Sequence, residues 1–141
     1  MKQTINILIS ILFVFITSIY AKEGETMKIS VNSNGNTTIY ELNNSSASKE
    51  LYAQLPLNIK VENYSNNEKI FYPPNKLTTT NTSLAKNAKA GTLAYYAHWG
   101  DVVMFYKDFE SANALYELGK VLCGAEYIEN MSGTITIDKM E

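Results

Sequence analysis

The sequence predicts one mainly β domain, with the antiparallel strands of a barrel or a sandwich. Short segments of alternating apolar and polar residues recur at even spacing, separated by turn residues. Only one segment has the apolar spacing of a clear helix. No repeat, charged block or linker divides residues 27–141, and a chain of 141 residues is long enough for one domain.

The run GTLAYYAHWGDVVMFY, at residues 91–106, is expected to form the centre of the sheet. It contains the only tryptophan and the only histidine of the chain. We expect two apolar strands, Thr92–Ala97 and Asp101–Tyr106, joined by a tight turn at His98–Gly100. A segment this rich in aromatic residues is most stable inside a β-sheet core.

The first 21 residues have the pattern of a secretory signal peptide. A basic start at Lys2 is followed by an apolar run of about 15 residues, which is short for a membrane span of roughly 20 residues. We therefore expect cleavage after Ala21, a secreted or periplasmic protein and no stable membrane anchor. The predicted boundaries are a signal peptide at 1–21, a polar leader at 22–26 and a barrel domain at 27–139.

Local patterns predict the other elements. Asn34-Gly35 indicates a hairpin, because both residues tolerate positive φ. Ala47–Leu55 has one apolar stripe, Ser45 or Ser46 to cap its first turn, and Pro56 after it. This helix is expected to cover an open end of a sheet or barrel. The predicted strands are Met27–Val31, Thr37–Leu42, Leu57–Tyr64, Lys69–Tyr72, Thr92–Ala97, Asp101–Tyr106, Gly119–Gly124 and Gly133–Asp138.

Three segments have weaker signals. Residues 75–90 are rich in Thr, Asn, Lys and Ala, and predict a long surface loop that is either a mobile decoration or functional. The pattern allows a short helix at Glu110–Leu115. A turn or a single helical turn is expected at Glu126–Asn130.

Composition excludes several classes of function. The formal net charge is −2, which gives no electrostatic basis for nucleic-acid binding. A single histidine and a single cysteine exclude a multi-histidine metal site and a cysteine cluster, so we expect no metal and no cofactor. Cys123 is expected to be buried and inert. Every basic residue is lysine, so no side chain can bind a carboxylate with a planar guanidinium fork.

Several short motifs resemble those of cyclophilins, and the chain as a whole is similar to the small bacterial cyclophilin-like domains over Met27–Asp138. These motifs are LGKVLCGAEYIENM at Leu118–Met131, KIFYPP at Lys69–Pro74, WGDVVMFY at Trp99–Tyr106 and the terminal GTITID. The resemblance implies a closed, mainly antiparallel cyclophilin-like β-barrel with one or two short capping helices.

The same resemblance implies a possible activity, the cis/trans isomerisation of peptide bonds before proline. The resemblance to cyclophilins implies that such an activity would need an apolar proline pocket beside an arginine. This arginine would hydrogen-bond the substrate backbone and stabilise the twisted transition state. The 141 residues contain no arginine, so this role has no residue to which it can be transferred. We therefore predict no catalytic residues.

The aromatic residues of the central strands are the best candidates for a ligand site. We propose Tyr95, Tyr96, Trp99 and Phe105, with the condition that Tyr95 and Tyr96 face opposite sides of one strand and cannot both line a pocket. His98 with Asp101 is the only nearby acid–base pair, and a turn histidine is the simpler interpretation.

The expected function is binding of a peptide or a small apolar ligand without efficient catalysis. The alternatives are a weak peptidyl-prolyl isomerase or folding helper of the cell envelope, and an interaction module of a larger assembly.

Overall fold

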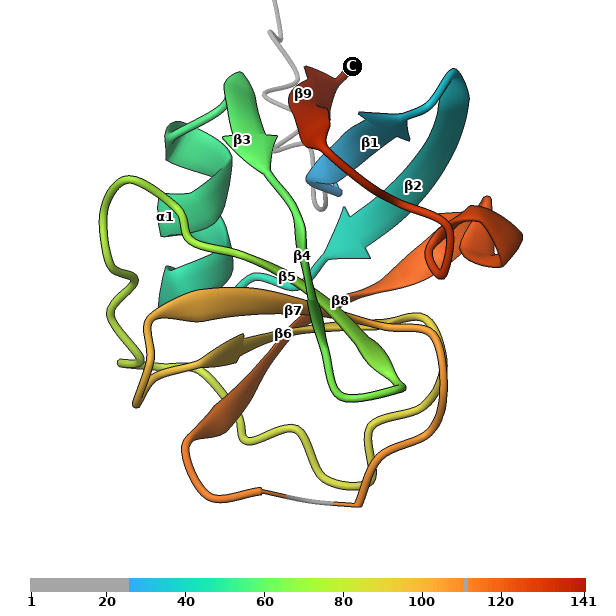
Figure 1. The fold of residues 1–141 in the computed structure, drawn as a ribbon. Helices are drawn as coiled ribbons and strands as arrows, with labels where there is room; N and C mark the ends of the chain where they lie inside the picture. The colour runs from blue at the N-terminus through green and yellow to red at the C-terminus, as the bar shows by residue number, and fades with distance from the viewer. Residues whose placement is uncertain (1–25, 111) are drawn as a thin grey trace, which may run out of the picture.

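The structure is a computed structural model that describes residues 26–110 and 112–141. Nine strands form one antiparallel sheet in the order β3-β9-β1-β2-β8-β6-β7-β5-β4 (Figure 1). The predicted signal peptide and most of the leader lie outside the described residues. Among the residues described, no helix is both long and apolar enough to cross a membrane. The sheet nearly closes on itself, so the predicted antiparallel barrel is confirmed.

The elements follow one another with short connections, apart from the segment between β5 and β6. They are β1 (Lys28–Ser33), β2 (Asn36–Leu42), α1 (Ser46–Ala53), β3 (Leu57–Lys60), β4 (Glu62–Tyr64), β5 (Glu68–Phe71), β6 (Thr92–Tyr96), β7 (Asp101–Phe105), β8 (Leu115–Cys123), the 3-10 helix η1 (Ala125–Tyr127) and β9 (Thr134–Met140).

A bend at Val61 brings the two edges of the sheet together. The sequence predicts one strand over Leu57–Tyr64, but the structure divides it into β3, which pairs with β9, and β4, which pairs with β5. The Val61 N–H donates to the Gly133 carbonyl at 2.9 Å, and the side chain is buried in the core. The prediction of one strand was wrong because alternation does not show where a strand changes its partner.

The hairpin and the helix agree with their local signals. Asn34 and Gly35 both have positive φ between β1 and β2. Ser45 caps α1, because its side chain accepts a hydrogen bond from the Ser48 N–H. The helix ends at Ala53, two residues earlier than predicted, and packs Ala47 and Leu51 into the core.

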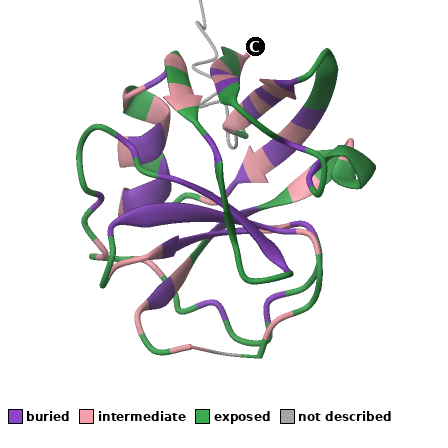
Figure 2. Ribbon diagram, viewed as in Figure 1, coloured by how far each residue is buried: buried purple, intermediate pink, exposed green. Residues whose placement is uncertain are grey.

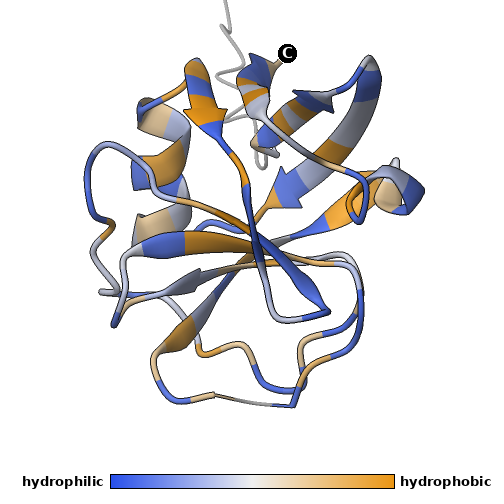
Figure 3. Ribbon diagram, in the orientation of Figure 1, coloured by the Kyte–Doolittle hydropathy of each residue, from blue (hydrophilic) through white to orange (hydrophobic). Residues whose placement is uncertain are grey.

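Strands β5, β6 and β7 are buried on both faces, which makes the fold two layers deep on this side (Figure 2). Val102 and Met104 of β7 point into the barrel core, while Val103 and Phe105 point outward into a second apolar cluster. Apolar residues therefore run along β7 without alternation (Figure 3). A strand that is buried on both faces is continuously apolar for this reason.

Two loops cover the outer face of these strands. Ala85 and Ala88 from the β5–β6 segment, with Phe109 and Ala112 from the β7–β8 segment, complete the outer cluster. Both segments lie beneath β6 and β7 in Figure 1. The segment 75–90 is thus a loop, as predicted, but it is packed on the sheet by its alanines.

The short helix predicted at Glu110–Leu115 is absent from the described residues of this segment. These residues form turns and irregular backbone, and β8 already begins at Leu115, four residues before the predicted strand. Leu115 packs into the outer cluster as a strand residue. Tertiary packing has overridden a weak helical pattern.

The prediction that Cys123 is buried was also wrong, because its thiol is exposed. The residue ends β8 beyond the part of the strand that the core covers, and its neighbour Leu122 is exposed as well.

Gly119 allows β2 and β8 to approach closely. A Cβ atom at this position would lie 2.1 Å from the Glu41 carbonyl oxygen of the neighbouring strand. We predict that Gly119→Ala lowers the free energy of unfolding by about 1–3 kcal/mol, because backbone cannot move aside as a flexible side chain can. Urea denaturation followed by circular dichroism measures this change.

Gly133→Ala is the matched control. Gly133 has positive φ and no atom within 4 Å of the added Cβ, so only backbone strain of about 1 kcal/mol is expected. A smaller loss for Gly119→Ala than for Gly133→Ala would contradict the packing argument.

Candidate functional site

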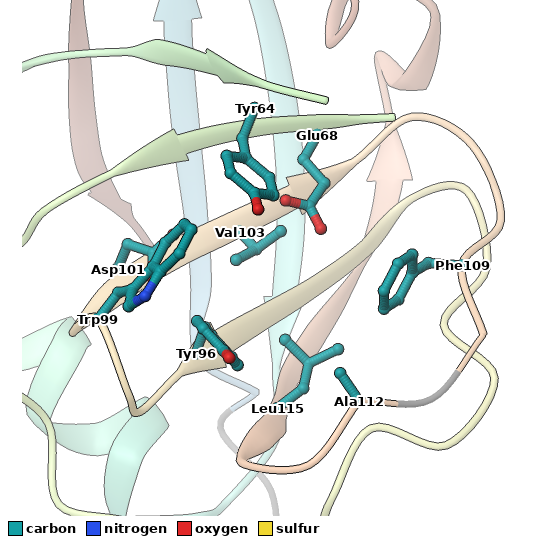
Figure 4. Close-up of a pocket in the computed structure, with 9 residues that line it drawn as sticks. All are labelled: Tyr64, Glu68, Tyr96, Trp99, Asp101, Val103, Phe109, Ala112 and Leu115. Atoms are coloured by element: carbon teal, nitrogen blue, oxygen red, sulfur yellow. The ribbon is translucent and has the colours of Figure 1, made fainter. Parts of the chain in front are cut away.

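A pocket lies on the outer face of β5, β7 and β6, where the two covering loops leave part of the sheet open. Its volume is about 140 Å³, close to the roughly 150 Å³ that holds one benzene-sized group. Figure 4 shows side chains converging from several elements around Val103. The lining residues are Tyr64, Glu68, Tyr96, Trp99, Asp101, Val103, Phe109, Ala112 and Leu115.

The strand register places these side chains on one face. Asp101 lies opposite Tyr96, and Tyr96 lies opposite Leu115 on the next strand. At the other end of the face, Glu68 lies opposite Tyr64. Cross-strand partners share a face of the sheet, so rigid backbone holds most of the wall.

The turn between β6 and β7 holds Trp99 at the mouth of the pocket. Gly100 has φ +74°, and its N–H donates to the Tyr96 carbonyl at 2.8 Å. This turn leaves the Trp99 side chain 48% exposed. Glycine adopts this conformation without the steric cost that other residues incur.

Three aromatic rings meet at this mouth at nearly right angles. The centroid of the Trp99 ring lies 5.0 Å from that of Tyr64, at an interplanar angle of 86°. It lies 5.5 Å from that of Tyr96, at 80°. Edge-to-face contacts at these distances are favourable, and they leave ring faces turned in different directions.

Two carboxylates line the same pocket with almost no access to water. Asp101 is 2% exposed and Glu68 is 7% exposed. The Asp101 Oδ1 atom has no hydrogen-bond partner among the described residues. Neither carboxylate takes part in an ion pair of the described residues. The ion pairs found there join Lys60 to Glu62 and Lys89 to Asp108.

Burial changes the ionisation of both groups. Burial, together with the nearby charge of Asp101, raises the pKa of the Glu68 carboxyl from 4.5 to about 7. Burial also raises the pKa of the Asp101 carboxyl from 3.8 to about 6, although its own backbone N–H opposes the change. Loss of hydration disfavours the charged form, and neither carboxyl forms an ion pair with a lysine of the described residues. Each group is therefore partly protonated near neutral pH.

The structure separates the four predicted site residues. Tyr96 and Trp99 line the pocket. Phe105 shares the outer face but lies under Phe109, with the ring centroids 5.6 Å apart. Tyr95 points into the barrel core, where its hydroxyl accepts a hydrogen bond from the Leu77 N–H at 3.1 Å. The expectation that Tyr95 and Tyr96 face opposite sides is confirmed, while ligand binding by any of the four stays a prediction.

His98 and Asp101 differ sharply in environment. His98 is exposed and contacts the edge of Tyr96, at a centroid distance of 5.4 Å, whereas Asp101 is buried. No hydrogen bond between the two is found in the described part of the chain. A turn histidine remains the simplest interpretation.

Sequence reasoning did not identify Glu68 or Tyr64 as pocket residues. One signal was available for Asp101, because it directly precedes the uninterrupted apolar run of β7. A continuous apolar run indicates a strand buried on both faces, and Asp101 stands at the start of that run. Glu68 has no comparable signal, since its burial depends on loops that are distant in sequence.

The described residues contain no group of three or more His, Cys, Asp or Glu side chains arranged to hold a metal ion. A larger hollow lies beside the loop at residues 85–91. It is bordered mainly by exposed loop residues and lacks aromatic rings and buried carboxylates.

The raised pKa values predict an unusual pH dependence of stability. Both carboxyls bind a proton more tightly in the folded chain than in the unfolded chain, so the free energy of unfolding falls as pH rises from about 4 to about 7. Glu68→Gln removes one of these ionisations. We expect it to stabilise the protein at pH 8, relative to pH 5, by on the order of 1–3 kcal/mol.

Urea denaturation at pH 5 and pH 8 measures this difference. Glu126→Gln is the control, because it removes an exposed carboxyl that lies outside the pocket. Equal pH slopes for the wild type and Glu68→Gln would contradict the prediction.

Comparison with known proteins agrees with this architecture. The described fold is similar to the solution structure of a hypothetical protein from Archaeoglobus fulgidus, with a TM-score of 0.64, 13% identity, and coverage of 85% of this chain and 99% of that one. It is also similar to the crystal structure of the Mimivirus cyclophilin, with a TM-score of 0.51, 11% identity, and coverage of 82% and 88%. At such low identity these likenesses show the fold alone.

No curated protein sequence matches this chain. The model of the Cyclophilin-like family matches residues 31–138, which is most of its length. The chain therefore belongs to the Cyclophilin-like family.

Proposed function

We propose that this protein is a binding module that takes a peptide side chain or a small ligand into the pocket above β7, without efficient catalysis. The observation that carries the proposal is the buried Asp101 carboxylate, whose Oδ1 atom has no partner in a pocket with an aromatic mouth. An unpaired buried acceptor costs free energy, and a ligand that donates to it would remove this cost.

The build of the pocket supports binding over a purely structural role. Its floor is formed by Val103 on a strand that is buried on both faces. Its mouth is formed by Trp99 and Tyr64, which are 48% and 44% exposed. Ligand sites commonly combine an apolar lining with a few polar groups on a rigid scaffold.

Chemistry argues against an efficient isomerase. Cyclophilin-type catalysis, as the family resemblance implies it, needs a guanidinium donor beside the proline pocket, and the 141 residues contain no arginine. A lysine ammonium is a flexible point charge and a poor substitute. The groups in this pocket are carboxylates, which accept hydrogen bonds when ionised. We also propose, from the signal-peptide pattern, that the protein acts after export from the cytoplasm.

Trp99 offers a direct test, because it is the only tryptophan of the chain and lies in the pocket wall. We expect ligands from a small-molecule and peptide screen to change Trp99 fluorescence. Ala112→Phe fills the cavity from the covering loop and should weaken binding at least tenfold. Ala125→Phe, at an exposed site on η1, is the control and should bind as the wild type does.

A prolyl-peptide isomerisation assay tests the rival function. We predict no acceleration above the uncatalysed rate for the full chain. Acceleration that Ala112→Phe abolishes and Ala125→Phe preserves would replace the binding module with an isomerase.

A further inference from the structure

We propose that the pocket binds an alkylammonium cation, held by the aromatic rings of Tyr64, Tyr96 and Trp99 and neutralised by Asp101 and Glu68. The proposal rests on the proposed function and names the chemical class of its ligand. It replaces the small apolar ligand that composition alone predicts, because the pocket contains two buried acidic groups.

The rings of Tyr64, Tyr96 and Trp99 lie together at the mouth of the pocket. Trp99 meets Tyr64 at 86° and Tyr96 at 80°, with centroid distances of 5.0 and 5.5 Å. Figure 4 shows Tyr64 above Val103 and next to Glu68, Tyr96 below Val103, and Trp99 next to Asp101. Ring faces carry partial negative charge and attract a desolvated ammonium group, so the ring faces that these mutual contacts leave uncovered can receive one.

A second feature is the missing partner of Asp101. This carboxylate is 2% exposed, lines the pocket, and has an Oδ1 atom without a hydrogen-bond partner in the described residues. Buried carboxylates are normally paired with a cation or with hydrogen-bond donors. An ammonium group that enters the pocket would supply the positive charge, and one with N–H groups would also supply the donor.

The pocket has room for one ammonium head, and no lysine lines it. A cavity of about 140 Å³ accepts one ammonium head with its attached methyl or methylene groups. None of the lining residues is a lysine. The cation must therefore come from a ligand, either as a free small amine or as the lysine side chain of a peptide.

Protonation of the carboxylates should oppose cation binding, so affinity should rise with pH between 5 and 8. Other titratable and charged groups lie near these two carboxylates. The groups around Glu68 are Tyr64 of β4, Asp101 of β7 and Tyr106. The groups around Asp101 are Tyr96 of β6, Tyr72 after β5, His98 of the turn, and Lys76, whose side chain packs near Gly100.

The experiment compares probes of similar shape that differ in charge. Choline and its neutral isostere 3,3-dimethylbutan-1-ol are titrated into the full chain, as are Nα-acetyl-lysine amide and its neutral counterpart Nα-acetyl-norleucine amide. Binding is followed by Trp99 fluorescence and by NMR shift changes at the Val103 and Leu115 methyl groups. We expect at least one cation to bind about tenfold or more tightly than its neutral counterpart.

Three variants locate the effect. Asp101→Asn keeps the size of the side chain and should remove most of the preference for the cation. Glu126→Gln changes an exposed charge outside the pocket and should leave it intact. His98→Gln should preserve the rise in affinity with pH, because the carboxylates cause it.

Each outcome decides the proposal. Tighter binding of choline identifies a free quaternary amine as the ligand type, and tighter binding of the lysine probe identifies a peptide side chain; both support the inference. If the neutral probes bind as well as the cations, the pocket keeps its binding function and the cation inference fails. If charged and neutral probes alike fail to bind while the screen finds other ligands, only the inference fails. If no compound binds, both proposals fail.

Discussion

Strands β5, β6 and β7 are buried on both faces, and both the covering loops and the pocket depend on this burial. The inner residues of β7, Val102 and Met104, fill the barrel, so its outer residues need a second apolar cover. The long segments before β6 and after β7 supply that cover with small and aromatic side chains. Burial of apolar surface contributes roughly 25 cal/mol per Å², which explains why these loops pack on the sheet although they lack regular structure.

The same cover creates the chemistry of the pocket. It closes over much of the outer face and leaves an opening where the Trp99 turn and the Tyr64 ring lie. Asp101 and Glu68 lie on the covered face because their cross-strand partners, Tyr96 and Tyr64, lie on that face. Their burial costs stability once they ionise, and no lysine lines the pocket to offset that cost.

Local patterns predicted most of the fold but only part of the site. The Asn34-Gly35 turn, the Ser45 cap and the two central strands depend on short-range rules, and the structure confirms them. The division of the third predicted strand at Val61 and the exposure of Cys123 depend on which strands meet across the sheet, which alternation does not show. Tyr96 and Trp99 could be selected as aromatic residues near a turn. The involvement of Glu68 could not, because distant loops bury it.

The pocket holds two buried carboxylates, and no lysine lines it. A carbon-13 NMR titration of the side-chain carboxyl carbons in the full chain tests whether burial governs their ionisation. Without ligand, Glu68 is expected to titrate with a pKa of about 7 and Asp101 with a pKa of about 6. Saturation with a bound alkylammonium cation should lower both values, because a positive charge favours the ionised form. Titration of both groups below about pH 5 in the absence of ligand, as for ordinary solvated carboxyls, would contradict the account.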